Sequence, residues 1–350
     1  MSYFIIFFNI MKQIKAIQII GTQRSGSNLL RVMLNQIQEI DAPHPPHILQ
    51  RFYPLLAKYG DLDDELSFIN LIDDVCKLIE KNPVPWEGFK LDREIIQQQC
   101  SSNTLHEIFR VIYHLKAMHS NASFWCCKSM SNINYVESIE ASGIKPFYIH
   151  LYRDGRDVAL SFKKAIVGPK HIYHIAKKWK EEQELCIQLK INIDKGRFIS
   201  ICYEDLIKNP EHILKQLCAF LKIPFSNTML NYYKSDESIK TALSGKMWAN
   251  ISQPILKNNY NKFLEEMDTV DLSLFENIAG NTLIKLNYKL YSNGDYKSIS
   301  KEDMEAYHVE NELLKQKSLL NADKEDLSKK SSQLQLLKDI ENRIIVKAVQ

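Results

Sequence analysis

The fold is decided by the stretch Ile19-Ile20-Gly21-Thr22-Gln23-Arg24-Ser25-Gly26-Ser27-Asn28-Leu29-Leu30. Before it, residues 14–20 are dense in isoleucine, which is typical of a strand buried in a parallel sheet. After it, residues 28–37 carry the apolar pattern of a helix that packs on such a strand. The order of strand, glycine-bearing loop and helix predicts an α/β fold.

The loop of this stretch has the properties of an anion site. Gly21 and Gly26 allow the backbone to turn tightly and to approach a ligand closely. The first amides of the following helix have no partners within the helix, and the helix dipole favours negative charge there. We therefore predict that the loop binds a phosphate through Thr22, Gln23, Arg24, Ser25, Gly26, Ser27 and Asn28. The alternative is a simple turn without a ligand.

The same loop departs from the P-loop of nucleoside-triphosphate enzymes. The spacing from Gly21 to Gly26 fits the first half of that pattern, which then requires Lys and Ser or Thr. Ser27 and Asn28 stand there instead, and Arg24 is the nearby cation. The loop therefore indicates phosphate binding of a kind other than that in ATPases and kinases.

Further strands and helices predict one large domain with a parallel sheet. Strand-like segments at residues 147–152 and 198–203 each precede a helical segment, and Asn209-Pro210 is a typical helix start. Residues 40–125 form a mostly helical insertion. We expect a P-loop-type central parallel sheet flanked by helices over residues 14–297.

Composition limits the function classes. The 350 residues have a formal net charge of +3, which does not point to a nucleic-acid partner. The seven cysteines lack paired spacing, which favours a reducing, cytoplasmic location, and we interpret Cys126 and Cys127 as small buried hydrophobes. Residues 1–13 form an apolar extension that is too short to span a membrane. Met11 could be the true start, and a membrane-touching anchor is the alternative.

The tail, residues 298–350, is charged and helical in pattern. Leu313, Leu320, Leu327 and Leu334 recur every seven residues, but the second apolar position of each heptad is polar. The pattern favours a solvated or docking helix, with self-association through residues 300–350 as the alternative.

A second anion anchor follows the strand at 147–152. Arg153 stands at its carboxyl end, and Ser161 lies eight residues later in the next helix. A guanidinium and a hydroxyl in these positions can converge on one anion. The alternative is that Arg153, Asp154, Arg156 and Asp157 form a surface cluster of ion pairs.

Together these motifs resemble the sulfotransferases that use 3′-phosphoadenosine-5′-phosphosulfate (PAPS). The resemblance runs from about residue 15 to residue 295, and includes a Tyr-Glu-Asp-Leu segment at residues 203–206. The chain looks closest to the tyrosylprotein-sulfotransferase branch and its bacterial relatives. Residues 241–248 are similar to that branch's Ala-Leu-Ser-Lys-Trp loop, although Gly245 and Met247 are extra.

The resemblance implies roles for these residues. Arg24 to Asn28 would hold the 5′-phosphosulfate end of PAPS, and Arg153 with Ser161 would hold the 3′-phosphate. Ser244 and Lys246 would lie over the donor, and Lys128 would stabilise charge together with Arg24 in a metal-free, in-line transfer. A solvated surface lysine is the alternative for Lys128. The resemblance also adds to the donor site Tyr203, Lys246 and Trp248.

An acceptor hydroxyl or amine must lose a proton, so a general base is expected. The tyrosylprotein branch has a Glu about twenty residues after the loop Arg, but this sequence has His44 there. Histidine titrates near neutral pH. We therefore predict His47 or His44 as the base, with His47 slightly favoured because it opens the next helix. A histidine that only caps this helix, or Asp41 as the base, are the alternatives.

Two other functions compete with a sulfotransferase: a P-loop kinase-like transferase, and a non-catalytic nucleotide-binding scaffold. The acceptor class does not follow from the sequence. Residues 50–125 are expected to build its pocket, and Trp86, Phe89, Tyr113 and Trp125 are either its walls or simply core.

Overall fold

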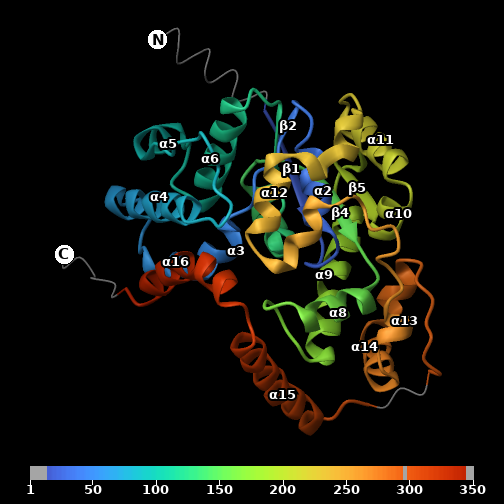
Figure 1. Ribbon diagram of the computed structural model, residues 1–350. Helices are drawn as coiled ribbons and strands as arrows, with labels where there is room; N and C mark the ends of the chain where they lie inside the picture. Colours follow the sequence, from blue (N-terminus) through green and yellow to red (C-terminus); the bar gives the residue numbers. More distant parts are fainter. Residues whose placement is uncertain (1–13, 295–297, 344–350) are drawn as a thin grey trace.

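The computed structural model describes residues 14–294 and 298–343 (Figure 1). Its centre is a five-stranded sheet in the order β2-β3-β1-β4-β5, and every strand pair is parallel. The strands are β1 (Lys15–Ile20), β2 (Ile40–Asp41), β3 (Phe124–Cys127), β4 (Phe147–Tyr152) and β5 (Phe198–Cys202). The chain is therefore an α/β protein with a parallel central sheet, as the sequence predicts.

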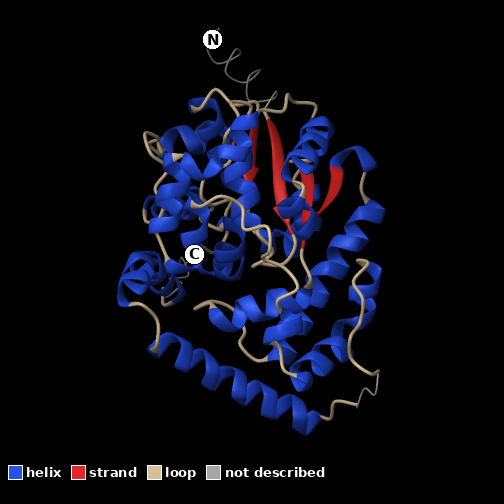
Figure 2. Cartoon of the chain, turned by 45° about the vertical axis from the view of Figure 1, so that its right-hand side comes forward, coloured by secondary structure: helices blue, strands red, loops and turns tan. Residues whose placement is uncertain are grey.

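Helices cover both faces of the sheet (Figure 2). The segment from β1 to β3 contains α2 (Ser27–Leu34), α3 (Ile48–Phe52), η1 (Tyr53–Lys58), α4 (Glu65–Glu80), α5 (Arg93–Gln99) and α6 (Leu105–His119). Between β3 and β5 lie η2 (Met130–Tyr135), α7 (Val136–Ala141), α8 (Gly155–Lys164), α9 (Ile172–Asn192) and η3 (Lys195–Arg197). After β5 follow α10 (Tyr203–Lys208), α11 (Pro210–Leu221), η4 (Asn227–Lys234), α12 (Asp236–Leu243), η5 (Lys246–Ser252), α13 (Phe263–Glu266) and α14 (Thr269–Lys285).

The alternation of side chains along the central strands divides the core into two main clusters. Ala16 and Trp125 pack with α3, α4 and α6 on one face of the sheet. Ile17 and Ile19 pack with α2 and α11 on the other face. Successive side chains of a strand point to opposite faces, so the apolar residues at both alternating sets of positions in β1 must be covered on both faces of the sheet.

Three of the five strands lie where the sequence predicts them, whereas β2 and β3 are not predicted. Residues 147–152 form β4, and β1 and β5 match their predicted segments to within one residue. The two residues of β2 and the first two of β3 fall in the predicted helical insertion, because such short buried strands have no periodicity. Cys126 and Cys127 lie in this strand and are buried, as interpreted from the sequence.

The tail folds into two helices, α15 (Lys301–Leu320) and α16 (Lys324–Glu341). In Figure 1, α15 runs along the lower edge of the molecule, and α16 returns to pack against α4 and η1. Leu336 and Ile340 of α16 join the core, whereas Leu313, Leu320 and Leu334 are largely exposed. The docking helix is therefore present, and self-association through the exposed leucines stays a prediction.

Within the described residues, no helix has both the length and the apolar character that crossing a bilayer requires. The predicted N-terminal extension, with its alternative start at Met11, lies outside the described residues.

Replacing Ile340 by Ala tests whether α16 is part of the fold. Ile340 is fully buried, so its truncation is expected to lower the free energy of unfolding by about 2–4 kcal/mol. Leu334→Ala is the matched control, because Leu334 lies on the same helix but is 55% exposed, and should change stability by less than about 0.5 kcal/mol. Urea denaturation of both variants measures the difference. Equal effects would mean that α16 does not pack on the core.

Candidate functional site

The site lies along the edge of the sheet where all strands end. Gly21 follows β1 directly, Lys128 follows β3, Arg153 follows β4 and Tyr203 follows β5. His44 stands three residues after β2. Parallel strands place their carboxyl ends at one edge, where such sheets bind ligands. The edge opens into a cleft of about 1250 Å³.

The loop between β1 and α2 is shaped for close approach of a ligand. Gly26 has a φ of 87°, and a Cβ there would lie 2.4 Å from the ring of Tyr203. Arg24 also has a left-handed backbone, with a φ of 73°, which is unusual for a residue with a side chain. No side chain caps α2, and its first turn has no acidic residue. The amides at this helix start are therefore available to an anion.

Several buried polar atoms around this loop have no partner within the described part of the chain. They are Ser25 Oγ, Asn28 Oδ1 and Arg153 Nε. Buried polar groups in folded proteins are almost always hydrogen-bonded, and exceptions need an explanation. A bound anion with several acceptor oxygens would supply partners for Ser25 and Arg153.

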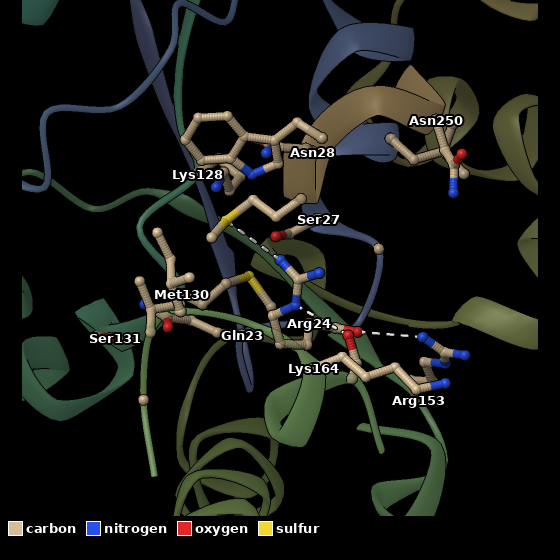
Figure 3. Close-up of a pocket in the computed structure, with 18 of the residues that line it drawn as sticks. Gln23, Arg24, Ser27, Asn28, Lys128, Met130, Ser131, Arg153, Lys164 and Asn250 are labelled. Carbon is tan, nitrogen blue, oxygen red and sulfur yellow. Dashed lines mark hydrogen bonds between the residues drawn. The ribbon is translucent and has the colours of Figure 1, made fainter. Parts of the chain in front are cut away.

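Arg24 and Arg153 both line the cleft, and in Figure 3 Arg153 lies to the right of Arg24. Arg24 Nε donates to Ser161 Oγ at 3.0 Å, and Arg153 Nη1 donates to the carbonyl oxygen of Arg24 at 3.4 Å. Burial lowers the pKa of Arg24, and the charge of Arg153 lowers it further. Arg153 is buried and Arg24 is half-buried, and these two neighbouring positive charges favour the binding of negative charge.

Arg153 is in addition held by its neighbours. Its guanidinium lies over the ring of Tyr203 at 4.7 Å, donates to the carbonyl of Asn259 at 2.9 Å and pairs with Asp157 at 3.5 Å. The predicted surface cluster is absent, because Arg153 and its three charged neighbours are all buried. Arg156 instead binds Asp154 and Glu276 inside the domain, so it supports the fold and does not line the cleft.

Four predicted residues lie outside the cleft lining, namely Ser25 and three residues whose side chains bind other parts of the chain. Thr22 accepts a hydrogen bond from Gln183 Nε2, which connects the loop to α9. Ser244 Oγ donates to the carbonyl of Thr241 at the end of α12. The Lys246 side chain is 79% exposed and pairs with Asp323 of the tail at 2.7 Å. Their predicted contacts with a donor stay predictions.

The other predicted donor-site residues are distributed around the cleft. Those that line it are Gln23, Arg24, Gly26, Ser27, Asn28, Lys128, Arg153, Ser161, Tyr203 and Trp248. Ser25 lies just beneath, fully buried.

Lys128 is buried, which corrects the alternative of a solvated surface lysine. Within the described residues, its ammonium has no ion pair or hydrogen bond. Burial, together with the charges of Arg31 and Arg24, lowers the pKa of Lys128 to about 7. An anion in the cleft would stabilise the protonated form.

His44 and His47 both line the cleft and lie near Lys128. His47 Nδ1 lies 3.1 Å from Ser129 Oγ, which orients the ring. Both nitrogens of His44 are enclosed without a partner within the described residues, and its ring packs edge-on against Trp248 at 5.2 Å. Burial is the main cause that lowers the pKa of each histidine well below its usual range, so both rings are neutral at pH 7.

Hydrogen bonds from other parts of the chain fix the backbone of the segment that carries these histidines. Arg31 donates to the carbonyl of Ala42 at 2.9 Å and to Thr241 of α12, also at 2.9 Å. The carbonyl of His44 accepts from Asn82 and Trp86. Asp41 pairs with Lys116 at 2.8 Å and does not line the cleft, which speaks against the alternative of Asp41 as a base.

The sequence pattern of the sulfotransferase family matches residues 16–227, more than half of the chain. The chain belongs to the sulfotransferase family. An uncharacterized protein of Aquifex aeolicus (strain VF5) is 23% identical over 239 residues, which cover 65% of this chain and 28% of that protein. The chain therefore spans little more than a quarter of this curated relative.

Two solved sulfotransferase domains share the fold of this family member. One is from the olefin synthase of Synechococcus PCC 7002, with 21% identity, a TM-score of 0.53, and coverage of 79% of this chain and 95% of that domain. The other is from the curacin biosynthetic pathway, with 21% identity, a TM-score of 0.50, and coverage of 79% and 99%. At this level of identity the likeness concerns the fold alone.

The cleft of this sulfotransferase-family chain also contains residues that the sequence did not predict. Arg51, Asn82 and Asn259 line it, as do Lys315, Lys330 and Gln333 of the tail. Arg51 could have been found, since it lies one helical turn after His47. The predicted aromatic walls are core: Trp86, Phe89, Tyr113 and Trp125 pack in or against the cluster around α4 and α6 and do not line the cleft.

Replacing Lys128 by Met tests the burial of its charge. The substitution should raise the free energy of unfolding by at least about 1 kcal/mol near neutral pH, because it removes a buried ammonium. The pKa of Lys128 in the folded protein, about 7, lies below that of a lysine in the unfolded chain. Between these two pKa values the unfolded wild type binds more protons than the folded wild type. The stability of the wild type therefore rises with pH in this range. The gain of the variant should therefore be largest at or below pH 7 and shrink towards pH 10.

Urea denaturation at pH 6 and pH 9.5 measures this trend. Lys338→Met removes an exposed charge from α16 and serves as the control, with no comparable change. A gain of equal size at both pH values would show that Lys128 is not buried in the charged form below pH 7.

Proposed function

We propose that this chain transfers a sulfuryl group from PAPS to a hydroxyl or amine acceptor. The observation that carries the proposal is the presence of two adjacent anion sites of different construction. One is the uncapped start of α2 with Ser25 and Arg24. The other is Arg153, whose Nε is buried without a partner within the described residues. PAPS carries negative charge at both its 5′ and its 3′ positions, so it fits two sites better than one.

The residues present suit this donor. Ser25, Ser27 and Asn28 with the first amides of α2 would hold the 5′ end. Arg153 would hold the 3′-phosphate, with Ser161, which Arg24 already contacts. Apolar side chains that line the cleft, Ile251, Pro254 and Ile255, offer a surface for the purine.

Charge stabilisation is the main task of the protein in this reaction. When bound, the donor supplies the sulfuryl group and a phosphate leaving group on which charge develops. Arg24 and Lys128 lie at the ends of β1 and β3, where their cations would stabilise that charge. Both are buried enough that water screens them little.

His47 is the proposed general base. The Ser129 hydroxyl orients its ring, and its lowered pKa keeps it neutral and able to accept a proton at pH 7. We place His44 second, because its nitrogens are enclosed and its ring packs against Trp248.

Binding of 3′-phosphoadenosine 5′-phosphate (PAP) against ADP tests the donor. Isothermal titration should give at least tenfold tighter binding of PAP, because only PAP places a phosphate at Arg153. Arg153→Met should weaken PAP binding about 10- to 100-fold and remove the preference. Arg93→Met, which lies outside the cleft, is the control and should keep both. Equal affinity of the wild type for PAP and ADP would overturn the proposal.

Turnover of the histidine variants tests the base. With an acceptor found by labelled-donor transfer across peptides, glycans and small hydroxyl compounds, His47→Gln should reduce kcat about 10²- to 10⁴-fold and leave PAP affinity unchanged. Because burial lowers the pKa of His47, the acid limb of the wild-type profile of kcat/KM should lie below pH 6.5. A larger loss in His44→Gln than in His47→Gln would assign the base to His44.

A further inference from the structure

Arg51 and Lys330 are two cations of the cleft that none of the roles above uses. Arg51 belongs to α3 and Lys330 to α16, so they come from opposite ends of the chain. Both line the same cleft, and burial lowers the pKa of Lys330, which the charges of Arg51 and Arg24 lower further. The tail therefore brings a second positive group to Arg51.

Neither cation is neutralised. Within the described residues, the guanidinium of Arg51 has no ion pair or hydrogen bond, and Lys330 has only a contact with the ring of Trp248 at 5.1 Å. Asp326, one turn before Lys330, is the nearest acidic influence, but its Oδ2 accepts from the backbone N–H of Lys246.

Each carboxylate that lines the cleft forms an ion pair with a cation other than Arg51 or Lys330. Three acidic side chains line it, and each has its own cationic partner: Asp157 pairs with Arg153, Glu266 with Lys164, and Glu312 with Lys315. Bringing two like charges together in a partly buried place is costly unless an anion joins them. The cleft thus has an excess of positive charge beside Arg51.

Arg51 lies on the His47 side of the cleft, whereas Lys330 also lies close enough to Arg24 to be affected by its charge. Arg51 lies four residues after His47, and its backbone N–H donates to the carbonyl of His47 at 3.0 Å. The donor anchors instead follow β1 and β4. Arg51 is therefore on the side of the base, where the acceptor must present the group that loses its proton.

The tail holds Lys330 in place through buried polar contacts. Gln333 Nε2 donates to the carbonyl of Leu78 at 2.7 Å, and Asp326 binds the loop that carries Trp248. Since both anchors flank Lys330 on α16, its ammonium is built into the wall of the cleft.

We propose that Arg51 and Lys330 together bind an oxyanion of the acceptor, a phosphate or a carboxylate, so that the acceptor is a negatively charged molecule. This inference rests on the proposed function for the meaning of "acceptor". The anion site itself depends only on the two side chains. The C-terminal helix α16 is then part of the substrate site.

Titration of anions into the PAP-saturated protein tests the inference. Inorganic phosphate in one arm and acetate in the other should bind to the full-length chain, and the tighter of the two names the acceptor's anionic group. Arg51→Met and Lys330→Met should each weaken that binding at least tenfold, and leave PAP affinity within twofold of the wild type. Arg51→Lys, which keeps the charge, should retain most of the binding. Lys338→Met, on the exposed side of α16, should retain all of it.

The outcomes separate this inference from the proposed donor. If the wild type does not bind PAP, the donor proposal fails, and the same titrations on the free protein still test the pair of cations. If phosphate and acetate both fail to bind once PAP is present, or bind equally well to the Met variants, the inference is overturned. Melting temperatures of the variants within about 2 °C of the wild type exclude loss of folding as the cause.

Discussion

All five strands of the sheet run in one direction, and this constraint gathers the site. Gly21, Lys128, Arg153 and Tyr203 are far apart in the sequence, yet each is the first residue after a strand. Because the strands are parallel, their carboxyl ends, and with them these four positions, lie at one edge of the sheet. Burial of the strands on both faces then keeps the edge rigid, which a site with several fixed charges needs.

The cost of this arrangement is electrostatic. Lys128 and Arg153 are buried and Arg24 is half-buried, and burial together with the charges of Arg31 and Arg24 lowers the pKa of Lys128 to about 7. In the protein without a ligand, the packing of the fold stabilises the backbone at each strand end and so compensates for the repulsion between these cations. Anionic ligands would relieve it, so the same positive charge that weakens the fold favours binding.

The places of the loop, of Arg153 and of the two histidines in the cleft lining follow from local residue types, whereas their roles stay predictions. The geometry of Gly21–Asn28 follows from two glycines and a helix start, and Arg153 from its place at a strand end. Ser244 and Lys246 were less predictable, because the tail draws the Lys246 side chain away to Asp323. The place of Lys330 in the cleft lining could not be predicted, because it arises only when α16 folds back onto α4, a contact between elements that are distant in the sequence. The aromatic residues of the insertion were predicted as either walls or core, and packing alone decides for the core.

A crystal structure of the full chain with PAP tests the central claim, that two separate anion sites hold one nucleotide. The account predicts the 5′-phosphate at the start of α2, within hydrogen-bond distance of Ser25 Oγ, and the 3′-phosphate on the guanidinium of Arg153. Both phosphates in the loop of Gly21–Asn28, with Arg153 still bound only to protein groups, would contradict it.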